Sequence, residues 1–376
     1  MLTFITGTIW LYVSWRFVWS LPCGPASRIG LALALLLVSQ QHQITRRFAG
    51  SMASPEIPYE ALLGLNWVFG TFLLLALLLL LRDVVGMLVL LAAPGAGREI
   101  LAGRPLLFSI GPLALLLAGI GVWQAVRVPD VKTLEITLPG LPPALDGYRI
   151  AQITDTHISR LLTGPWVEAV VARTNALDPD LTVITGDIAD GTPEARAAGV
   201  RPLGALRARD GVLAIPGNHE YYADYQRWMN AYRGLGLHML ENAHVLIEHD
   251  GATFAVAGIT DRQAATFDQP RPDLAAALKG LAPDMPVILL SHRPGGAALH
   301  AQAGAALQLS GHTHGGQILG PHILTQWANE GYVSGLYQVG DMRLYVSNGT
   351  GLWNGLAIRL GRPSEITLIV LRAQAR

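Results

Sequence analysis

Aspartate, asparagine and histidine gather in five short clusters in the last two thirds of the sequence, each directly after an apolar run. In chain order the clusters are Asp155-Thr156-His157, Gly186-Asp187-Ile188-Ala189-Asp190, Gly217-Asn218-His219-Glu220, Ser291-His292 and Gly311-His312-Thr313-His314-Gly315-Gly316. Carboxylate oxygens and imidazole nitrogens together suit divalent metals such as manganese, iron or zinc. Two such ions close together can bind both the attacking and the leaving oxygen of a phosphoryl displacement. The residue types therefore indicate metal-assisted phosphoryl chemistry.

The apolar runs before these clusters predict the strands that position them, because side chains at strand ends, in turns with glycine, can converge in one crevice. We predict strands at residues 148–154, 181–185, 212–215, 287–290, 307–310 and 366–371, two more within 245–260, and a hairpin over 337–346. Helices are predicted near residues 165–178, 196–208, 224–235 and 272–281. This order is typical of an α/β fold, here a sandwich of two mixed β-sheets flanked by helices.

The motif order D-x-H, G-D-x-x-D, G-N-H-E, H and G-H-x-H resembles that of the calcineurin-like metallophosphoesterase superfamily. The resemblance covers about Tyr148 to Leu371. One such motif alone is unspecific, whereas five in order, each after a predicted strand, are specific. The chain is most similar to the branch with N-terminal transmembrane helices, which closes with a glycine-rich segment and a proline-containing stretch, here residues 347–351 and 362–366.

By motif position, the resemblance implies a site for two divalent ions, with manganese expected first and iron or zinc as alternatives. Asp155, His157 and His314 are expected to hold one ion. Asn218, His292 and His312 are expected to hold the other, and Asp187 to bridge both. A hydroxide between the ions is the expected nucleophile, its pKa lowered by both cations.

The resemblance also implies two catalytic residues outside the ligand set. His219 is expected to donate a proton or hydrogen bond to the phosphate or the leaving oxygen, and Asp190 to pair with His219. In related protein phosphatases an arginine that grips phosphate follows this second aspartate, but Gly191 stands here. Phosphate binding is then expected to rest on the metals, His219 and Arg359, although Arg359 also fits an ordinary surface arginine. This departure favours phosphodiesters or pyrophosphates over phosphoproteins.

The first third of the chain has the composition of a membrane region. Hydrophobic residues make up 51% of the chain and charged residues 14%. The apolar excess lies in runs at residues 4–21, 29–38, 62–81 (continued at 84–93) and 106–125. About 20 apolar residues cross a bilayer core, so we predict four transmembrane helices and a multi-pass protein. Arg16 is expected to snorkel to the interface, with a polar pocket as the alternative. We place the membrane region at residues 1–129 and the catalytic domain at 130–376.

Several classes of function are disfavoured by composition. The formal net charge is zero, so no nucleic-acid partner is expected. Cys23 is the only cysteine, which excludes a disulfide framework. Basic residues balance on the two sides of the predicted spans, so the side of the membrane that carries the catalytic domain is undetermined.

Two functions of different class remain open, with a third that is weaker. The first is a hydrolase acting on a membrane-associated phosphoester, with lipid-linked phosphodiesters and pyrophosphates among the candidate substrates. The second is an inactive metallophosphoesterase-like binding scaffold, which would have lost ligands; here every expected ligand is present. The third is a transporter with a regulatory domain, which the lack of obvious paired polar residues in the spans disfavours.

Overall fold

The structure is a computed structural model of the whole chain and describes residues 2–374. Its contacts divide the chain into two compact units. The helical unit comprises the chain up to Gln124 together with a short later segment, Asn354–Ile358. The sheet unit comprises Ala125–Trp353 and the chain from Arg359 onward. The division falls between Gln124 and Ala125, five residues before the boundary predicted from the sequence.

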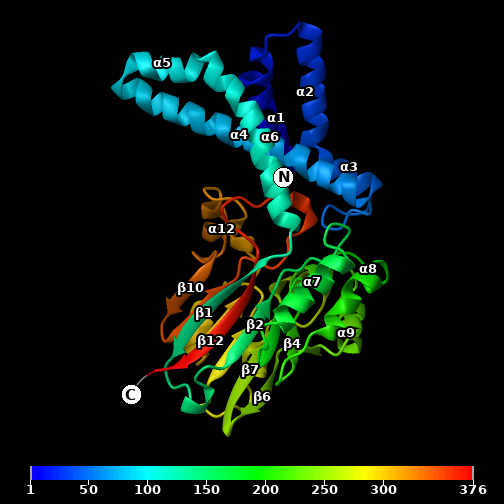
Figure 1. Cartoon of the computed structure of the whole chain (residues 1–376), viewed down its shortest axis with the longest axis vertical. Coiled ribbons are helices and arrows are strands. Elements are labelled where there is room, and N and C mark those ends of the chain that lie inside the picture. Colours follow the sequence, from blue (N-terminus) through cyan, green and yellow to red (C-terminus); the bar gives the residue numbers. More distant parts are fainter. Residues whose placement is uncertain (1, 375–376) are drawn as a thin grey trace. The chain divides into compact units, whose positions relative to one another are not determined.

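The helical unit is built from six α-helices (Figure 1). They are α1 (Leu2–Arg16), α2 (Pro25–Ser39), α3 (Gln41–Phe48), α4 (Tyr59–Ala92), α5 (Pro94–Ala102) and α6 (Arg104–Val126). The predicted run 62–81 and its continuation 84–93 form one unbroken helix, α4. Helix α5 folds back along the end of α4, where Gly97 passes so close to Leu90 that a Cβ atom would collide with its backbone.

Two of these helices, α4 with 34 residues and α6 with 23, are long and apolar enough to cross a membrane. At 1.5 Å per residue the 15 residues of α1 or α2 extend only about 22 Å, short of the roughly 30 Å hydrocarbon core. The structure therefore supports one or two spans, and the prediction of four spans in a multi-pass protein is not supported. The difference arises because apolar residues continue through turns. The predicted run 4–21 has 18 residues, but helix α1 ends at Arg16 and has only 15.

A polar cluster joins α1 to α4. Arg16 Nε and Nη2 donate to the two carboxylate oxygens of Asp83 at 2.7 and 2.5 Å, and Tyr12 Oη donates to the same group at 2.8 Å. Arg82 donates to the carbonyl oxygens of Ile100 and Leu101. The contacts of Arg16 fit the polar pocket that was the alternative to snorkelling. The expectation that these helices hold no paired polar residues was wrong, because the partner of Arg16 lies 67 positions away in the sequence.

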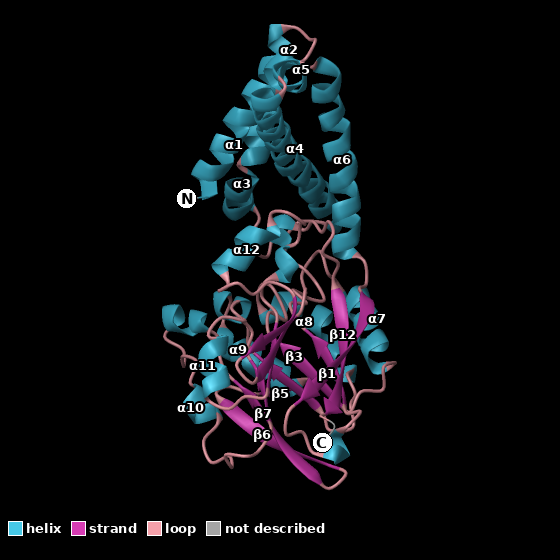
Figure 2. Ribbon diagram, turned by 90° about the vertical axis from the view of Figure 1, so that its left-hand side faces the viewer, coloured by secondary structure: helices cyan, strands magenta, loops and turns pink. Residues whose placement is uncertain are grey.

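The sheet unit contains two six-stranded mixed sheets. The first has the strand order β1-β12-β2-β3-β4-β5 and the second β10-β11-β9-β8-β7-β6. The strands are β1 (Asp130–Leu138), β2 (Arg149–Ile153), β3 (Leu181–Thr185), β4 (Val212–Ile215), β5 (His238–Met239), β6 (Ala243–His249), β7 (Ala252–Gly258), β8 (Val287–Leu290), β9 (Leu307–Ser310), β10 (Gly335–Val339), β11 (Met342–Val346) and β12 (Glu365–Ala373). Colouring by secondary structure places all of them in this unit (Figure 2).

Alternating side chains of the central strands fill three apolar layers, since successive residues of a strand point to opposite faces. Val183 of β3 packs between the two sheets, while its neighbour Ile184 packs under the outer helices of the first sheet. Ile288 of β8 likewise faces the first sheet, and Leu289 faces the helices of the second. The helices are α7 (Gly164–Asn175), α8 (Pro193–Val200), α9 (Tyr225–Gly234), α10 (Leu274–Ala277), α11 (Ala297–Gln302) and α12 (His322–Ala328).

The predicted fold class, two mixed sheets flanked by helices behind an N-terminal helical region, is confirmed. Individual elements differ. The predicted helix 196–208 is α8, which ends at Val200 and continues as a 3₁₀ turn, because Pro202 has no N–H to donate to an α-helical bond. Strand β1 was not predicted, since its register is set by pairing with β12, more than 230 residues away.

Candidate metal centre

Parallel strands bring the five polar clusters to one edge of the sandwich. Strands β2, β3 and β4 run parallel in the first sheet, as do β8 and β9 in the second. Each predicted cluster follows the carboxyl end of one of these strands. The cluster side chains of both sheets therefore converge at that edge. The residues involved are Asp155 after β2, Asp187 after β3, Asn218 after β4, His292 after β8, and His312 with His314 after β9.

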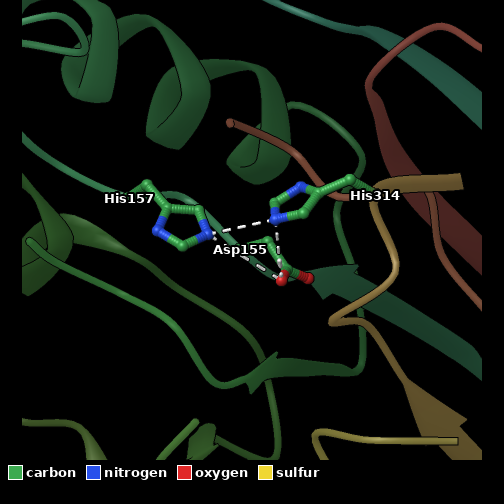
Figure 3. A group of neighbouring side chains, drawn as sticks. All are labelled: Asp155, His157 and His314. Atoms are coloured by element: carbon green, nitrogen blue, oxygen red, sulfur yellow. Dashed lines mark hydrogen bonds and ion pairs between the residues drawn. The ribbon is translucent and has the colours of Figure 1, made fainter. Parts of the chain in front are cut away.

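The first group of converging side chains is Asp155, His157 and His314, all buried (Figure 3). The Nε2 atoms of His157 and His314 lie 3.2 Å apart, and they lie 4.0 and 3.6 Å from Asp155 Oδ1. Three ligand atoms that face one another in this way, without an apolar group between them, have the arrangement of a coordination sphere. This is the set predicted from the sequence to hold one ion.

The second group forms around Asp187. Its Oδ2 atom lies 3.2 Å from His292 Nε2 and 3.7 Å from His157 Nε2, and His312 completes a group whose ligand atoms lie within 4.8 Å of one another. Asp187 thus lies between a histidine of the first group and the histidines of the second, where a bridging ligand has to be. Asn218 is connected to this group by Arg293, whose guanidinium donates hydrogen bonds to both Asn218 Oδ1 and His312 Nε2.

The backbone at these side chains is held in an uncommon conformation. Five of the seven predicted ligands have positive φ angles between 43° and 69°: Asp155, His157, Asp187, His312 and His314. The left-handed region is costly for residues with a Cβ atom and persists only where the surrounding structure enforces it. Seven other non-glycine residues of the described chain share positive φ, so at the five predicted ligands the observation shows only that tight turns fix the direction of these side chains.

Two glycines make this close packing of carboxylates feasible. A Cβ atom on Gly217 would collide with Asp187 Oδ1, and one on Gly311 would collide with Asp155 Oδ2. Both glycines were part of the predicted motifs, and the structure gives their physical reason: the backbone of one strand end passes within contact distance of the carboxylate of another.

Glu220 is a buried residue of the third cluster to which sequence reasoning gave no role. Its carboxylate accepts hydrogen bonds from the backbone N–H groups of Gly217 at 2.7 Å, Ile188 at 2.8 Å and Asp187 at 3.2 Å. It thereby ties the loop after β4 to the loop after β3. The position of Glu220 in the G-N-H-E motif was the feature of the sequence from which this role could have been predicted.

His219 and Asp190 form a pair beside these groups of converging side chains, and His219 itself offers a nitrogen within 4.8 Å of the ligand atoms of His157 and Asp187. Asp190 Oδ1 lies 2.6 Å from His219 Nδ1 and 3.2 Å from His157 Nδ1. Burial alone would lower the pKa of His219, but the carboxylates of Asp187 and Asp190 outweigh it and raise the pKa to about 9. A protonated His219 whose Nδ1 is held by Asp190 has its Nε2–H available as a donor, and Nε2 lies 3.9 Å from Asp187 Oδ2.

The chemistry of the donor atoms fits divalent ions. His292 Nδ1 lies 2.8 Å from the carbonyl oxygen of Thr185, which fixes the proton on Nδ1 and leaves Nε2 as the ligand atom. That buried Nε2 lies 3.2 Å from Asp187 Oδ2 and has no other partner among the described residues. Burial lowers the pKa of His292, but Asp187 and Asp155 raise it to about 10, so a cation that binds Nε2 would have to displace a proton from it.

Arg359 does not have the position expected for a residue that binds substrate. Its side chain is fully buried, and its terminal nitrogens donate to the backbone carbonyl oxygens of His314, Arg362, Asn348 and Gly351 at 2.7 to 3.1 Å. The guanidinium therefore fastens the glycine-rich segment to the loop of His314. The prediction that Arg359 contacts the substrate is corrected to a positioning role, which one sequence could not reveal because backbone carbonyls leave no sequence signal.

Arg293 is a second residue at the site that sequence reasoning missed. Its Nη1 lies 2.6 Å from His312 Nε2, its Nη2 donates to Asn218 Oδ1 at 3.0 Å, and its Nε donates to Asp261 Oδ2 at 2.7 Å. Arg293 directly follows the predicted ligand His292, and this position was the one feature of the sequence that could have indicated a place at the site.

The fold and the site together define a metallophosphoesterase architecture: a two-sheet sandwich whose strand ends present aspartate, asparagine and histidine in two adjoining groups. Residues 148–316 match the model of the calcineurin-like phosphoesterase family. An uncharacterized metallophosphoesterase of Bacillus subtilis, YkuE, is 33% identical over 267 residues, which cover 68% of this chain and 90% of that protein. The chain belongs to the calcineurin-like phosphoesterase family.

Other relatives are longer than the matched region. A protein of Bos taurus named transmembrane protein with metallophosphoesterase domain is 36% identical over 285 residues, 73% of this chain and 63% of that protein. The counterpart from Danio rerio is 34% identical over 269 residues, covering 69% of this chain and 61% of that protein. The chain thus spans about three fifths of the length of these two relatives.

Proposed function

We propose that this protein is a membrane-anchored, two-metal phosphoesterase that hydrolyses phosphodiesters or pyrophosphates. The observation that carries the proposal is the convergence of Asp155, His157 and His314 with Asp187, His292 and His312 in two adjoining groups. An inactive scaffold would be expected to have lost ligands, whereas all seven predicted ligands are present here, five of them in turns whose backbone conformation fixes the direction of the side chain.

Each side chain has a role that follows from its contacts. The two aspartates and four histidines, with Asn218, would hold two divalent ions, with Asp187 between them. Bound ions of this kind lower the pKa of a shared water and stabilise the developing negative charge on phosphorus-bound oxygens. His219, oriented by Asp190, would donate its Nε2 proton to the leaving oxygen. Manganese is the metal we propose first, since the carboxylate and amide oxygens suit it, with iron or zinc, which imidazole nitrogens suit, as alternatives.

A lipid-linked substrate is the preferred class. Helices α4 and α6 would hold the catalytic unit at a bilayer, where lipid-linked phosphoesters are concentrated. The name of the Bos taurus relative is consistent with such an anchor.

The test uses the full-length protein in detergent, loaded with manganese. Hydrolysis is measured for a soluble aryl phosphodiester, for an aryl phosphomonoester, and for phosphodiester or pyrophosphate lipids in mixed micelles. The proposal predicts turnover of the diester and greater turnover of a lipid-linked compound, both abolished by chelator and restored by metal. Turnover of the monoester alone would contradict the substrate class, and absence of turnover with two ions bound would contradict the proposal itself.

A further inference from the structure

Arg293 holds an unusual position for an arginine, since its guanidinium contacts two side chains predicted to bind metal. Asn218 Oδ1 and His312 Nε2 lie 3.0 and 2.6 Å from its two terminal nitrogens. Both atoms are ones that a divalent ion would use. The guanidinium therefore lies at the edge of the second ligand group, beside the place where substrate oxygens must approach the ions.

The other side of the guanidinium is anchored. Nε donates to Asp261 Oδ2 at 2.7 Å, and the Asp261 side chain is only 1% exposed, whereas that of Arg293 is 16% exposed. The Asp261 carboxylate also accepts a hydrogen bond from the backbone N–H of Gln263 at 2.7 Å. This leaves the two terminal nitrogens, rather than Nε, as the groups that can exchange partners.

A cavity of about 230 Å³ adjoins Arg293 and His292. Charged and polar side chains contribute to its wall, among them Asp261, Arg262, His300 and Glu330. The volume lies below the roughly 300 Å³ at which ordinary ligand pockets begin. It leaves room for a compact substituent next to a phosphate.

From these contacts we infer that Arg293 binds a non-bridging phosphate oxygen of the substrate through its terminal nitrogens, and that Asp261 positions it to do so. The inference rests on the proposed function and specifies how that site recognises phosphate. A guanidinium presents two parallel N–H groups that match phosphate oxygens, which an ammonium cannot do. The cavity next to Arg293 and Asp261 would then accommodate a compact substituent of that phosphate.

The experiment uses the full-length, metal-loaded protein and inorganic phosphate as the probe, with binding measured by calorimetry and bound metal by elemental analysis. Arg293→Met should keep both ions and bind phosphate about 10- to 100-fold more weakly, the worth of one or two charge-assisted hydrogen bonds. Arg293→Lys should recover part of the loss, and Asp261→Asn should show a smaller loss. Arg209→Met is the matched control, because Arg209 forms a similar ion pair with Asp250 on the turn between β6 and β7.

The metal content separates this role from a structural one. If Arg293 only oriented Asn218 and His312, Arg293→Met would lose an ion; we expect metal to bind as tightly as in the wild type or more tightly, because the guanidinium no longer competes for two ligand atoms. Undiminished phosphate binding by Arg293→Met, or loss of an ion in it, would overturn the inference while leaving the proposed function intact. A wild-type protein that takes up no ions would overturn the proposed function itself.

Discussion

At the scale of single residues, His219 and Asp187 lie close together but are expected to act differently. His219 Nδ1 is held by Asp190 at 2.6 Å, whereas Asp187 approaches histidines of both ligand groups. His219→Gln should therefore keep two ions per chain while turnover falls by about 100- to 10,000-fold, the usual worth of a positioned acid. The loss should be greatest for poor alkoxide leaving groups and smaller for nitrophenolate, which needs no proton.

Asp190→Asn is the companion variant, since it should show a milder form of the same pattern by loosening the hold on His219. Metal content and turnover on two leaving groups check both variants. Loss of an ion from His219→Gln would make His219 a ligand, and full activity on a poor leaving group would remove its role in protonation.

A second residue-scale prediction concerns Gly217, whose Cα faces the Asp187 carboxylate. Gly217→Ala places a methyl group against Asp187 Oδ1 and should displace the carboxylate, so metal occupancy and activity should fall together. Gly234→Ala at the end of α9 is the control, because a Cβ atom there meets open space and should leave stability unchanged or raise it by about 0.5–1 kcal/mol. Normal metal content in Gly217→Ala would show that the close approach does not matter.

At the scale of secondary-structure elements, the predictable parts are those with local signals. The strands before the clusters were predicted within a residue or two, because each is an apolar run closed by glycine or a polar turn. Strand β1, the short helices α11 and α12, and the ion pair of Arg16 with Asp83 were not, because long-range pairing or packing creates them. The ligand residues carried a motif signal, whereas Arg293 depends on partners distant in sequence and Arg359 binds backbone carbonyl oxygens, which leave no signal in the sequence.

An element-scale prediction follows from the segment Asn354–Ile358, which belongs to the helical unit. Asn66 on α4 accepts a hydrogen bond from the backbone N–H of Ala357 at 2.8 Å, and Asn354 donates to the carbonyl oxygen of Ala53 at 3.1 Å. Asn66→Ala leaves the buried N–H of Ala357 without its acceptor, at a cost of about 1–3 kcal/mol. Amide hydrogen exchange at residues 354–358 should rise.

The control for this variant is Thr71→Ala on the same helix, whose hydroxyl only bonds the carbonyl oxygen of Trp67 one turn earlier. Protection of the segment should be unaffected there. Equal exchange in Asn66→Ala and the wild type would mean that other contacts hold the segment in place.

At the scale of the whole molecule, the seven predicted ligands and both predicted catalytic residues lie in the sheet unit. A truncated chain beginning at Ala125 should therefore fold and hydrolyse a soluble aryl phosphodiester. It should begin there rather than at Asp130, because Arg127 and Pro129 carbonyls accept hydrogen bonds from Trp166 and Arg173 of α7. Its segment 354–358 loses Asn66 and should exchange freely. Circular dichroism measures the folding of the truncated chain, and turnover measures its activity. If the truncated chain is unfolded, the helical unit is needed for the catalytic domain to fold.

The central claim, a dinuclear metal centre bridged by Asp187, is tested most directly by counting metal. Elemental analysis of the purified full-length protein after loading with manganese should find close to two ions per chain. Asp187→Asn, which removes a negative charge from between the two ligand groups, should lose ions and activity together. A wild-type protein that binds no metal at any loading, or an Asp187→Asn variant that keeps two ions, would contradict the account.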